Sequence, residues 1–285
     1  MFSNRLYTPL RYPGGKGAFA PFVIDVMRKN NLAGHYLEPY AGGAGVALCL
    51  LLEDVVQHIH INDIDPAVYS FWISVTQHPD ELLRLLRATP VSIEQWLHWR
   101  SILRGEIDAS VVEKGFATLF MNRTNRSGIL KAGVIGGLDQ NGPYKIDARF
   151  KKDVIQSRIE KIAEQSNRIT VHCEDALSLI QRCQEFLPSS SLIYLDPPYF
   201  VKGKGLYRNY YAPHDHARIA NFLQSGSFRT SWIVSYDSAP EIQSMYSRSR
   251  SIRYSLNYSA QRMYRADESV FFSSDLLPPD ISIAS

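Results

Sequence analysis

Residues 38–45 read EPYAGGAG and directly follow a short predicted strand at residues 35–38. The glycines predict a tight turn, and the apolar residues after them predict a helix that ends near Glu53. A second predicted strand, residues 58–62, follows that helix and leads into Asp63. A strand, a glycine turn, a helix and another strand form a unit whose strands run parallel with a right-handed connection. This stretch therefore predicts an α/β fold.

The same alternation of strands and helices returns in the second half of the chain. Strands are predicted at 168–173, 192–195 and 232–235, and helices at 176–186 and 214–224, in addition to a helix at 16–30. Two later segments, 250–258 and 269–273, flank a polar tip at 259–267 and predict a hairpin that closes the sheet.

The middle of the chain has a different pattern. Residues 66–125 show mainly helical spacing, and residues 121–150 are rich in Gly, Asn and Arg. We therefore expect one catalytic domain built from residues 1–66 and 151–285. A helical insertion with a glycine-rich hairpin or loop, residues 67–150, interrupts it.

Composition narrows the class of protein without fixing it. The chain has 285 residues, 45% of them apolar, and a net charge of only +3, which is ordinary for a protein with a packed core. Basic and aromatic residues nevertheless cluster at 121–152, 202–211 and 248–265. Such clusters are typical of surfaces that follow phosphates and stack on bases, although solvated loops can have the same composition.

Several sequence features argue against secretion, against a membrane span and against a metal site. The three cysteines lack the spacing of zinc ligands, so we predict no metal. The N-terminus lacks the apolar core of a signal peptide, and no stretch is apolar enough to span a membrane. We therefore expect a cytoplasmic protein that has no membrane partner.

The glycine turn and Asp63 together predict a nucleoside-containing cofactor. Gly42 and its neighbours let the backbone approach a ligand, and an acidic residue about twenty positions later is suited to bind ribose hydroxyls. Both NAD and S-adenosylmethionine fit this pattern, although the third glycine of the dinucleotide motif is missing. Lys16, at the start of a predicted helix, is suited to a carboxylate such as that of a methionine moiety. Asp175 is suited either to a cofactor amine or to capping the next helix.

The sequence Asp196-Pro197-Pro198-Tyr199 follows the buried strand at 192–195. Asp196 supplies an acceptor, the prolines supply rigid carbonyl groups without N–H donors, and Tyr199 supplies a flat ring. Together these parts suit a planar base that carries an exocyclic amine. The alternative is a strand-ending turn with a core tyrosine.

These motifs, in this order, resemble the Dam-like class of adenine-specific DNA methyltransferases. The matching stretches are residues 11–17, 37–48, 61–65, 121–130, 143–152, 174–175 and 193–199, which together span most of the chain. The resemblance implies a Rossmann-like methyltransferase sheet, S-adenosylmethionine as the cofactor and double-stranded DNA as the substrate. It also implies that a target adenine is flipped out of the duplex before its exocyclic amine is methylated.

The resemblance also assigns residues to roles. The catalytic set is Asp196, Pro197, Pro198 and Tyr199, where Asp196 and the Pro197 carbonyl accept the amine protons and Tyr199 stacks on the base. The predicted cofactor contacts are Tyr12, Lys16, Glu38, Gly42, Gly43, Gly45, Asp63, Asp175 and Asp196. The predicted DNA contacts are Asn122, Arg123, Asn125, Arg126 and Lys131 in the insertion, and Arg262 and Arg265 at the hairpin tip.

Other functions remain open from the residues alone. An RNA methyltransferase or a methyltransferase for protein amides could use a similar site, and a catalytically silent DNA-binding regulator could keep the same fold. A nicotinamide-dependent oxidoreductase is a further alternative. A restriction or defence partner is compatible with the resemblance, whereas the DNA recognition sequence and the oligomeric state do not follow from it.

Overall fold

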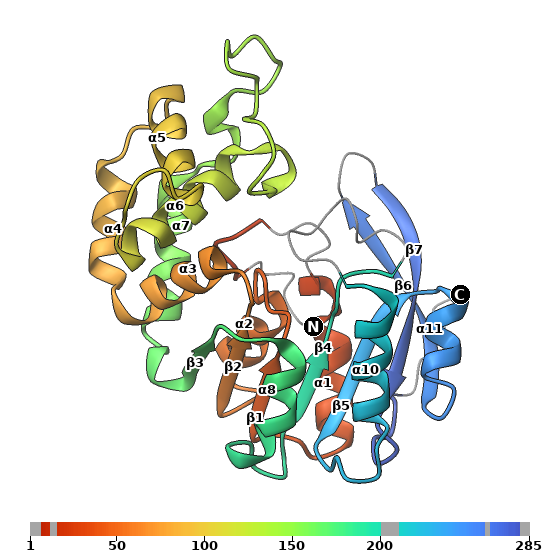
Figure 1. Cartoon of the computed structure of the whole chain (residues 1–285). Coiled ribbons are helices and arrows are strands. Elements are labelled where there is room, and N and C mark those ends of the chain that lie inside the picture. Colours follow the sequence, from red (N-terminus) through yellow and green to blue (C-terminus); the bar gives the residue numbers. More distant parts are fainter. Residues whose placement is uncertain (1–6, 12–15, 201–210, 260–262, 280–285) are drawn as a thin grey trace.

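The computed structural model describes residues 7–11, 16–200, 211–259 and 263–279 (Figure 1). In this part of the chain, seven strands form one sheet in the order β3-β2-β1-β4-β5-β7-β6. The strands are β1 His35–Glu38, β2 His58–Asn62, β3 Ile169–His172, β4 Leu192–Leu195, β5 Ser231–Asp237, β6 Arg250–Ser259 and β7 Met263–Phe272. Strands β3, β2, β1, β4 and β5 are parallel, whereas β7 is antiparallel to both of its neighbours.

Helices cover both faces of this sheet, which is why the central strands are apolar on both sides. On one face, helices α1 (Ala20–Lys29) and α2 (Gly45–Leu52) pack with Tyr36 and Tyr194 of the sheet. On the other face, helices α8 (Ala176–Arg182), α10 (Pro213–Leu223) and α11 (Pro240–Met245) pack with Leu37 and Ile193. Alternate side chains of β1 and β4 therefore point to opposite faces of the sheet, and they pack into two separate hydrophobic cores.

This architecture confirms the predicted Rossmann-like methyltransferase sheet with a helical insertion and a hairpin. One boundary was wrong, because β7 begins at Met263 and the predicted polar tip at 259–267 is therefore too long. Strand pairing continues from Phe272 back to Met263, opposite Ser259 of β6. Backbone hydrogen bonds between antiparallel strands do not need apolar side chains, so a polar sequence can continue the ladder.

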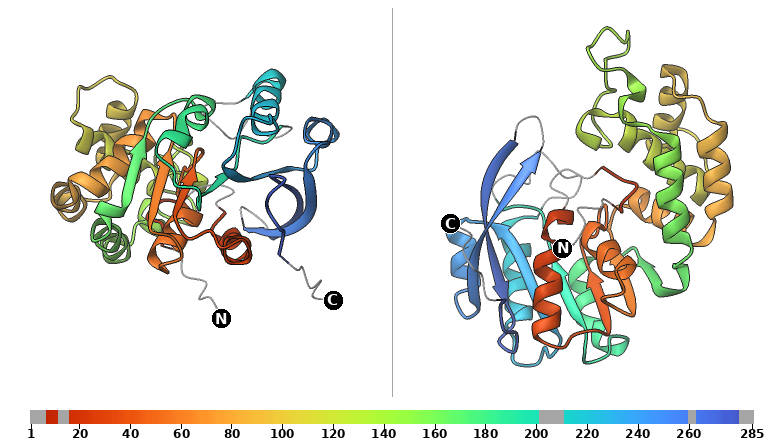
Figure 2. Two further views of the ribbon diagram at one scale, coloured as in Figure 1. Left: turned by 90° about the horizontal axis from the view of Figure 1, so that it is seen from below. Right: turned by 180° about the vertical axis from the view of Figure 1, so that it is seen from behind.

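The insertion consists of packed helices at the β3 end of the sheet, opposite the β6–β7 hairpin (Figures 1 and 2). Its helices are α3 (Pro66–Gln77), α4 (Pro79–Ala88), α5 (Ile93–Leu103) and α6 (Val111–Thr124). Helix α7 (Lys152–Ala163) also packs against α3 and α4. Because α7 packs against α3 and α4, the packed group of helices extends to Ala163. The sequence predicts that the insertion ends at residue 150.

Side-chain caps in the sequence explain where these helices begin. Asp65 accepts a hydrogen bond from the backbone N–H of Ala67 at 3.0 Å, and Pro66 occupies the first turn of α3. Ser110 and Glu113 form a reciprocal capping box at the start of α6. These caps satisfy backbone N–H groups that have no partner within their own helix.

A row of imidazoles crosses the first three strands on the face that α8 covers. His60 Nε2 lies 3.0 Å from His35 Nδ1, and His60 Nδ1 lies 3.4 Å from His172 Nε2. His58 lies beside both His35 and His60, with ring centroids 5.0 and 4.8 Å away. Burial, followed by the neighbouring imidazoles, lowers the pKa of His60 to about 3. Burial also lowers the pKa values of the other three histidines.

We expect the row of histidines to make the fold sensitive to acid. The pKa of His60 is lower in the folded than in the unfolded chain, so the unfolded state binds more protons below about pH 6.5. Stability is therefore lost as the pH falls, and His60 alone accounts for about 2 kcal/mol at pH 5. Thermal unfolding of wild type and His60→Gln between pH 5 and 8 measures this, and the variant should show a shallower dependence. His214→Gln, at an exposed position on α10, is the matched control, and an unchanged slope for His60→Gln would contradict the prediction.

Candidate active site

The predicted site residues meet at the edge where the parallel strands β1, β2 and β4 end. This edge is where open α/β sheets bind their ligands. Gly42 has a left-handed φ of 45°, and so does Ala44, with a φ of 48°. The turn between β1 and α2 therefore folds back on itself, and a Cβ atom at Gly45 would lie only 3.3 Å from the backbone nitrogen of Gly17.

Asp63 is tied to this glycine turn. Its carboxylate accepts hydrogen bonds from the backbone N–H groups of Gly42 at 3.1 Å and of Asp65 at 2.9 Å. Trp72 donates to the carbonyl oxygen of Gly42 at 2.9 Å, which holds the turn from the other side. Burial raises the pKa of Asp63 to about 7 despite these two hydrogen bonds. The turn and the acid thus form one preorganised unit, as their spacing in the sequence predicts.

Two neighbouring residues complete this part of the edge. Glu38 is buried and accepts a hydrogen bond from the N–H of Ala47 at 3.2 Å, and burial raises its pKa well above the usual range. Asn62 donates to the carbonyl oxygens of Pro39 at 2.9 Å and of Glu174 at 3.0 Å. Asn62 therefore fastens the ends of β1 and β3 together, a role that the sequence did not reveal.

Lys16 lies at the centre of the second part of the site. Its side chain is 3% exposed, and its ammonium group donates to both carboxylate oxygens of Glu268, at 2.5 and 2.6 Å. The same nitrogen lies 3.3 Å from Asp196 Oδ1 and 3.2 Å from the hydroxyl oxygen of Tyr199. Two carboxylates from strands β4 and β7 therefore share one buried ammonium group.

A side chain of the neighbouring strand also positions Asp196. Ser235 of β5 donates to Asp196 Oδ1 at 3.1 Å, and the Ser235 hydroxyl lies 2.8 Å from that of Tyr194. Burial raises the pKa of Asp196 to about 6, Lys16 acts to lower it and Glu268 acts to raise it. At neutral pH the carboxyl group is therefore mainly ionised, and it can accept hydrogen bonds from a ligand amine.

The remaining residues of the tetrapeptide are arranged around Asp196. Pro197 is buried, whereas Pro198 and Tyr199 are half-buried. The Tyr199 hydroxyl donates to Glu268 Oε1 at 2.8 Å, and the Lys16 ammonium lies 5.3 Å from the centre of the Tyr199 ring. The position of the tyrosine ring is thus set by a buried acid as well as by the proline turn.

Asp175 is the N-cap of α8. Its carboxylate is exposed and accepts a hydrogen bond from the N–H of Ser178 at 3.0 Å. This observation confirms the capping alternative, and the predicted cofactor contact remains a prediction. The adjacent Glu174 forms an ion pair with Arg182, which lowers the pKa of Glu174.

The structure buries the side chains of three residues that the sequence predicts to contact DNA. Asn122 binds the backbone of Arg11 and the carbonyl oxygen of Gly128, at 2.7–2.9 Å. Arg123 is 8% exposed and donates to the carbonyl oxygen of Pro9. Asn125, which is fully buried, accepts from Trp96 at 2.7 Å and donates to the carbonyl oxygens of Ile129 and Leu130.

These three side chains satisfy backbone groups of the N-terminal segment and of the chain after α6, where burial would otherwise leave polar atoms without partners. Contacts within the protein thus account for their polarity, and a contact of these residues with DNA remains a prediction. By contrast, Arg126 and Lys131 are exposed. Tyr12 and Arg262 lie outside the described residues, and so does the side chain of Arg265.

Glu268 is the main site residue that the sequence did not reveal. It is 2% exposed and lies on β7, opposite Asp237 of β5. Residues in the middle of the antiparallel strand β7 pair with the carboxyl end of β5. They therefore lie at the same sheet edge at which the parallel strands end. A sequence signal existed, since an acidic residue beside an apolar β-segment is unusual, but no local motif connects Glu268 with Lys16.

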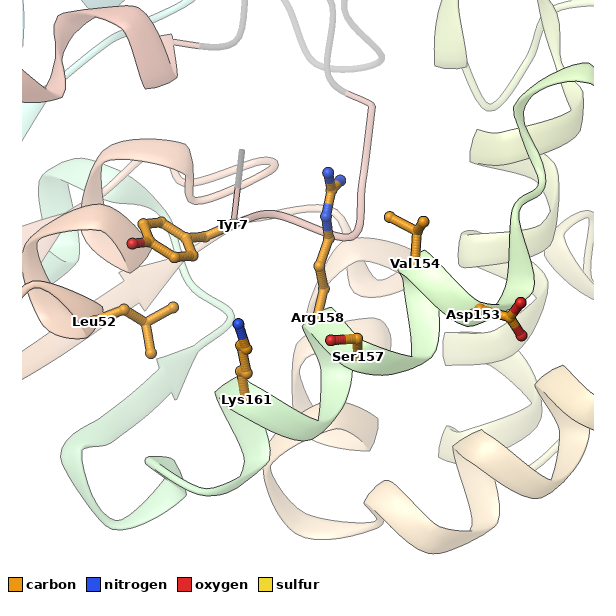
Figure 3. A pocket seen from close by; sticks show the side chains of 7 residues that line it. All are labelled: Tyr7, Leu52, Asp153, Val154, Ser157, Arg158 and Lys161. Atoms are coloured by element: carbon orange, nitrogen blue, oxygen red, sulfur yellow. The ribbon is translucent and has the colours of Figure 1, made fainter. Parts of the chain in front are cut away.

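A cavity of about 460 Å³ lies elsewhere, between the N-terminal segment and α7. Figure 3 shows Arg158 and Lys161 pointing from α7 towards the side on which Tyr7 lies. Leu52, Asp153, Val154 and Ser157 complete its lining. Arg158 donates to the carbonyl oxygen of Thr8 at 2.9 Å, so its charge helps to fix the N-terminal segment. None of the predicted site residues lines this cavity.

Within the described residues, no three or more His, Cys, Asp or Glu side chains form a group that could hold a metal ion. Among the helices that the structure describes, none combines the length and the apolar character needed to cross a bilayer.

The sequence matches a known protein family. The model of the D12 class of N6 adenine-specific DNA methyltransferases matches residues 12–262. The Type II methyltransferase M.MjaIII of Methanocaldococcus jannaschii is 22% identical over 205 residues, which cover 67% of this chain and 68% of that protein.

Solved structures with a related arrangement are more distant. The rRNA methyltransferase aviRa from Streptomyces viridochromogenes has a TM-score of 0.41 and 10% identity, over 92% of this chain and 85% of that one. PH1948 from Pyrococcus horikoshii, described as a candidate RNA methyltransferase, also has a TM-score of 0.41 and 10% identity, over 93% and 86% of the two chains.

Proposed function

Because the chain belongs to the D12 class of N6 adenine-specific DNA methyltransferases, we propose that Asp196 and Tyr199 receive the adenine that is methylated. The observation that carries this proposal is the buried network in which Lys16 contacts Asp196, Tyr199 and Glu268. The network lies at the sheet edge that also holds the glycine turn and Asp63. The acceptor proposed for the adenine amine therefore lies at the same sheet edge as the residues proposed to bind a nucleoside.

The residues at the glycine turn fit S-adenosylmethionine. Asp63 offers a half-buried carboxylate beside the glycine turn that is suited to hydrogen bonds with ribose hydroxyls, and the turn at Gly42, Gly43 and Gly45 allows close approach of the backbone. Glu38 is a buried acid beside that turn. When bound, the cofactor supplies a methyl group activated on a sulfonium. Tyr12 is proposed to line this site on the basis of the family resemblance alone.

The target adenine must leave the duplex, because its amine cannot reach a buried site while the base is stacked. We assign the Tyr199 ring to stack on the flipped base. The Asp196 carboxylate and the Pro197 carbonyl accept hydrogen bonds from the two N–H groups of the amine. These hydrogen bonds orient the nitrogen lone pair towards the methyl carbon. As the nitrogen–carbon bond forms, the bond between the methyl carbon and the sulfonium sulfur would break, its electron pair would stay on sulfur, and S-adenosylhomocysteine would leave. The proton that the nitrogen then loses would pass to Asp196 or to water. Catalysis comes mainly from positioning and from fixed charge in a dry site.

The insertion is proposed to hold the DNA. Its loop at residues 129–150 extends away from the sheet (Figure 1), and it carries exposed Lys131, Lys145 and Arg149. Leu138 and Tyr144 in this loop are 58% and 65% exposed. A basic loop with exposed apolar and aromatic side chains is suited to bind phosphates and to contact unstacked bases.

The same loop is held in a defined shape by its own residues. Gln140 donates to the carbonyl oxygen of Ile135 at 2.8 Å and accepts from the N–H of Ile146 at 2.7 Å. Gly136 has a φ of 87°, and a Cβ atom there would lie 2.7 Å from the carbonyl oxygen of Tyr144. Such preorganisation lowers the entropy cost of binding.

Arg126 and Arg123, three residues apart, should behave in opposite ways. Arg126→Ala should leave thermal stability unchanged but weaken binding to duplex DNA. The dependence of the binding constant on salt concentration should become shallower, by the amount that corresponds to about one phosphate contact. Arg123→Ala should instead reduce the free energy of unfolding by about 1.5–3 kcal/mol, because a buried charged donor is lost. Fluorescence anisotropy at several salt concentrations and thermal melts measure the two effects. A loss of DNA affinity in Arg123→Ala without any loss of stability would contradict the assignment.

Long-read sequencing of DNA from cells that express the chain tests the proposed function. It should reveal N6-methyladenine at one short sequence, and the Asp196→Asn variant should remove the signal. Absence of modified adenine in cells that contain folded protein would overturn the proposal. We further propose that the enzyme acts in the cytoplasm beside a restriction partner, as the Type II relative suggests. A nuclease blocked by the mapped methylation would support that pairing.

A further inference from the structure

Glu268 makes contacts that no known motif of the chain explains. Its side chain is 3% exposed, and it is brought to the site by an antiparallel strand far from the tetrapeptide in sequence. A carboxylate this deeply buried is costly unless it is paired and hydrogen-bonded. Lys16 and Tyr199 supply three hydrogen bonds to its two oxygens, at 2.5, 2.6 and 2.8 Å.

Of the two carboxylates described beside Lys16, Glu268 is the closer. Both oxygens of Glu268 lie within 2.6 Å of the ammonium nitrogen, whereas Asp196 Oδ1 lies 3.3 Å away. The ammonium is therefore anchored on β7 and extends its charge to Asp196. Without that anchor, the flexible lysine side chain would close onto Asp196 and compete with a ligand amine for its oxygens.

Glu268 also fixes the tyrosine. The hydroxyl of Tyr199 donates to the same Oε1 atom that accepts from Lys16. A ring held by the backbone at one end and by this hydrogen bond at the other has little freedom to rotate. One carboxylate thus restrains both the charge beside the acceptor and the surface proposed to stack on the base.

The charges add a second consequence. Among the described residues of this cluster, Lys16 carries one positive formal charge, and Asp196 and Glu268 each carry one negative formal charge. An amine nitrogen that attacks a methyl group gains positive charge before it loses its proton. A preorganised negative site stabilises that charge in the transition state more than it stabilises the neutral base.

We propose that Glu268 is a positioning residue for methyl transfer, which holds Lys16 and Tyr199 in the arrangement that the target adenine requires. This inference rests on the proposed function of Asp196 and Tyr199. It assigns Glu268 no contact with the base or the cofactor. Its effect should therefore appear in the chemical step rather than in the affinity for DNA.

Glu268→Gln tests the inference, with Glu241→Gln on α11 as an exposed control. We expect kcat to fall about 10²-fold, the loss typical of a misplaced reacting group, while KM for duplex DNA stays unchanged. The acidic limb of the pH–rate profile should move to lower pH, because one of the charges that opposes ionisation of Asp196 is removed. A purely structural role for Glu268 would not shift this limb.

The companion variant is Tyr199→Phe, which keeps the ring and removes only the hydroxyl. Its effect on kcat should not add to that of Glu268→Gln, because both changes break the same hydrogen bond. Glu268→Asp, which keeps the charge, should recover part of the rate. Thermal melts and calorimetric titration with S-adenosylhomocysteine show whether each variant is folded and binds a nucleoside ligand.

Two outcomes would overturn the inference. One is a Glu268→Gln enzyme, folded and binding S-adenosylhomocysteine, that retains the wild-type kcat. The other is a loss of rate with an unmoved acidic limb and strictly additive effects in the double variant. If Glu268→Gln is active while Asp196→Asn is inactive, only this inference fails. If Asp196→Asn is active, the proposed function of that site fails as well.

Discussion

Asp196→Asn should lower kcat for DNA methylation by about 10²–10³-fold, the usual cost of removing one preorganised electrostatic group. The substitution keeps the size of the side chain and the hydrogen bond from Ser235. It removes the negative charge, and it places an amide that can donate where a ligand amine needs an acceptor. Single-turnover methylation with tritiated cofactor measures the chemical step directly.

Asp25→Asn is the matched control, since Asp25 is an exposed carboxylate on α1. It should methylate DNA at the wild-type rate. Affinity for S-adenosylhomocysteine, measured by calorimetry in both variants, separates a loss of the chemical step from a loss of the cofactor contact that the sequence also predicts for Asp196. An Asp196→Asn enzyme with an undiminished single-turnover rate would contradict the assigned role of this carboxylate.

Lys16→Met should be the most destabilising of the substitutions considered. It removes the ammonium group that lies between the buried Glu268 and the half-buried Asp196. Removal of one partner from a buried ion pair typically costs about 3–5 kcal/mol of unfolding free energy. Denaturant unfolding at pH 7.5 measures the loss. The loss should be smaller at pH 5, because the unpaired carboxyl groups can bind protons there.

The double variant Lys16→Met/Glu268→Gln separates charge from packing. Removal of one of the two unpaired charges should restore part of the stability that Lys16→Met loses. Lys114→Met, at an exposed position on α6, is the control and should change the unfolding free energy little. A Lys16→Met enzyme as stable as the control would show that the buried ion pairs are not formed in solution.

Much of the fold and part of the site can be predicted from local patterns in the sequence. The glycine turn, Asp63 and the tetrapeptide at 196–199 each sit at the end of a strand, and parallel strands bring such ends to one edge. Because each signal lies within a few residues of its strand, the sequence alone suffices to bring them together. Pairing of Asp63 with the N–H of Gly42 follows directly from this arrangement.

The contacts that could not be predicted depend on strand order and on burial. Glu268 joins the site only because β7 inserts between β5 and β6 in the antiparallel direction. Conversely, Asn122 and Asn125 look like base-reading amides in the sequence, but their buried side chains bind backbone groups of Gly128 and Ile129. Polarity in a basic segment does not distinguish a side chain that meets DNA from one that supports the loop, because burial is a tertiary property.

The central claim is that a flipped adenine is received at Asp196 and Tyr199. It is tested most directly by 2-aminopurine fluorescence in a duplex that carries the analogue at the methylated adenine of the mapped site. Addition of the protein with S-adenosylhomocysteine should raise the fluorescence, and Tyr199→Ala should raise it further, because the base would leave the stack without finding the tyrosine ring. An analogue at the neighbouring base should give the smaller response of a stacked position. Fluorescence that stays at the level of free duplex for the target position, in a complex shown to form, would contradict the account.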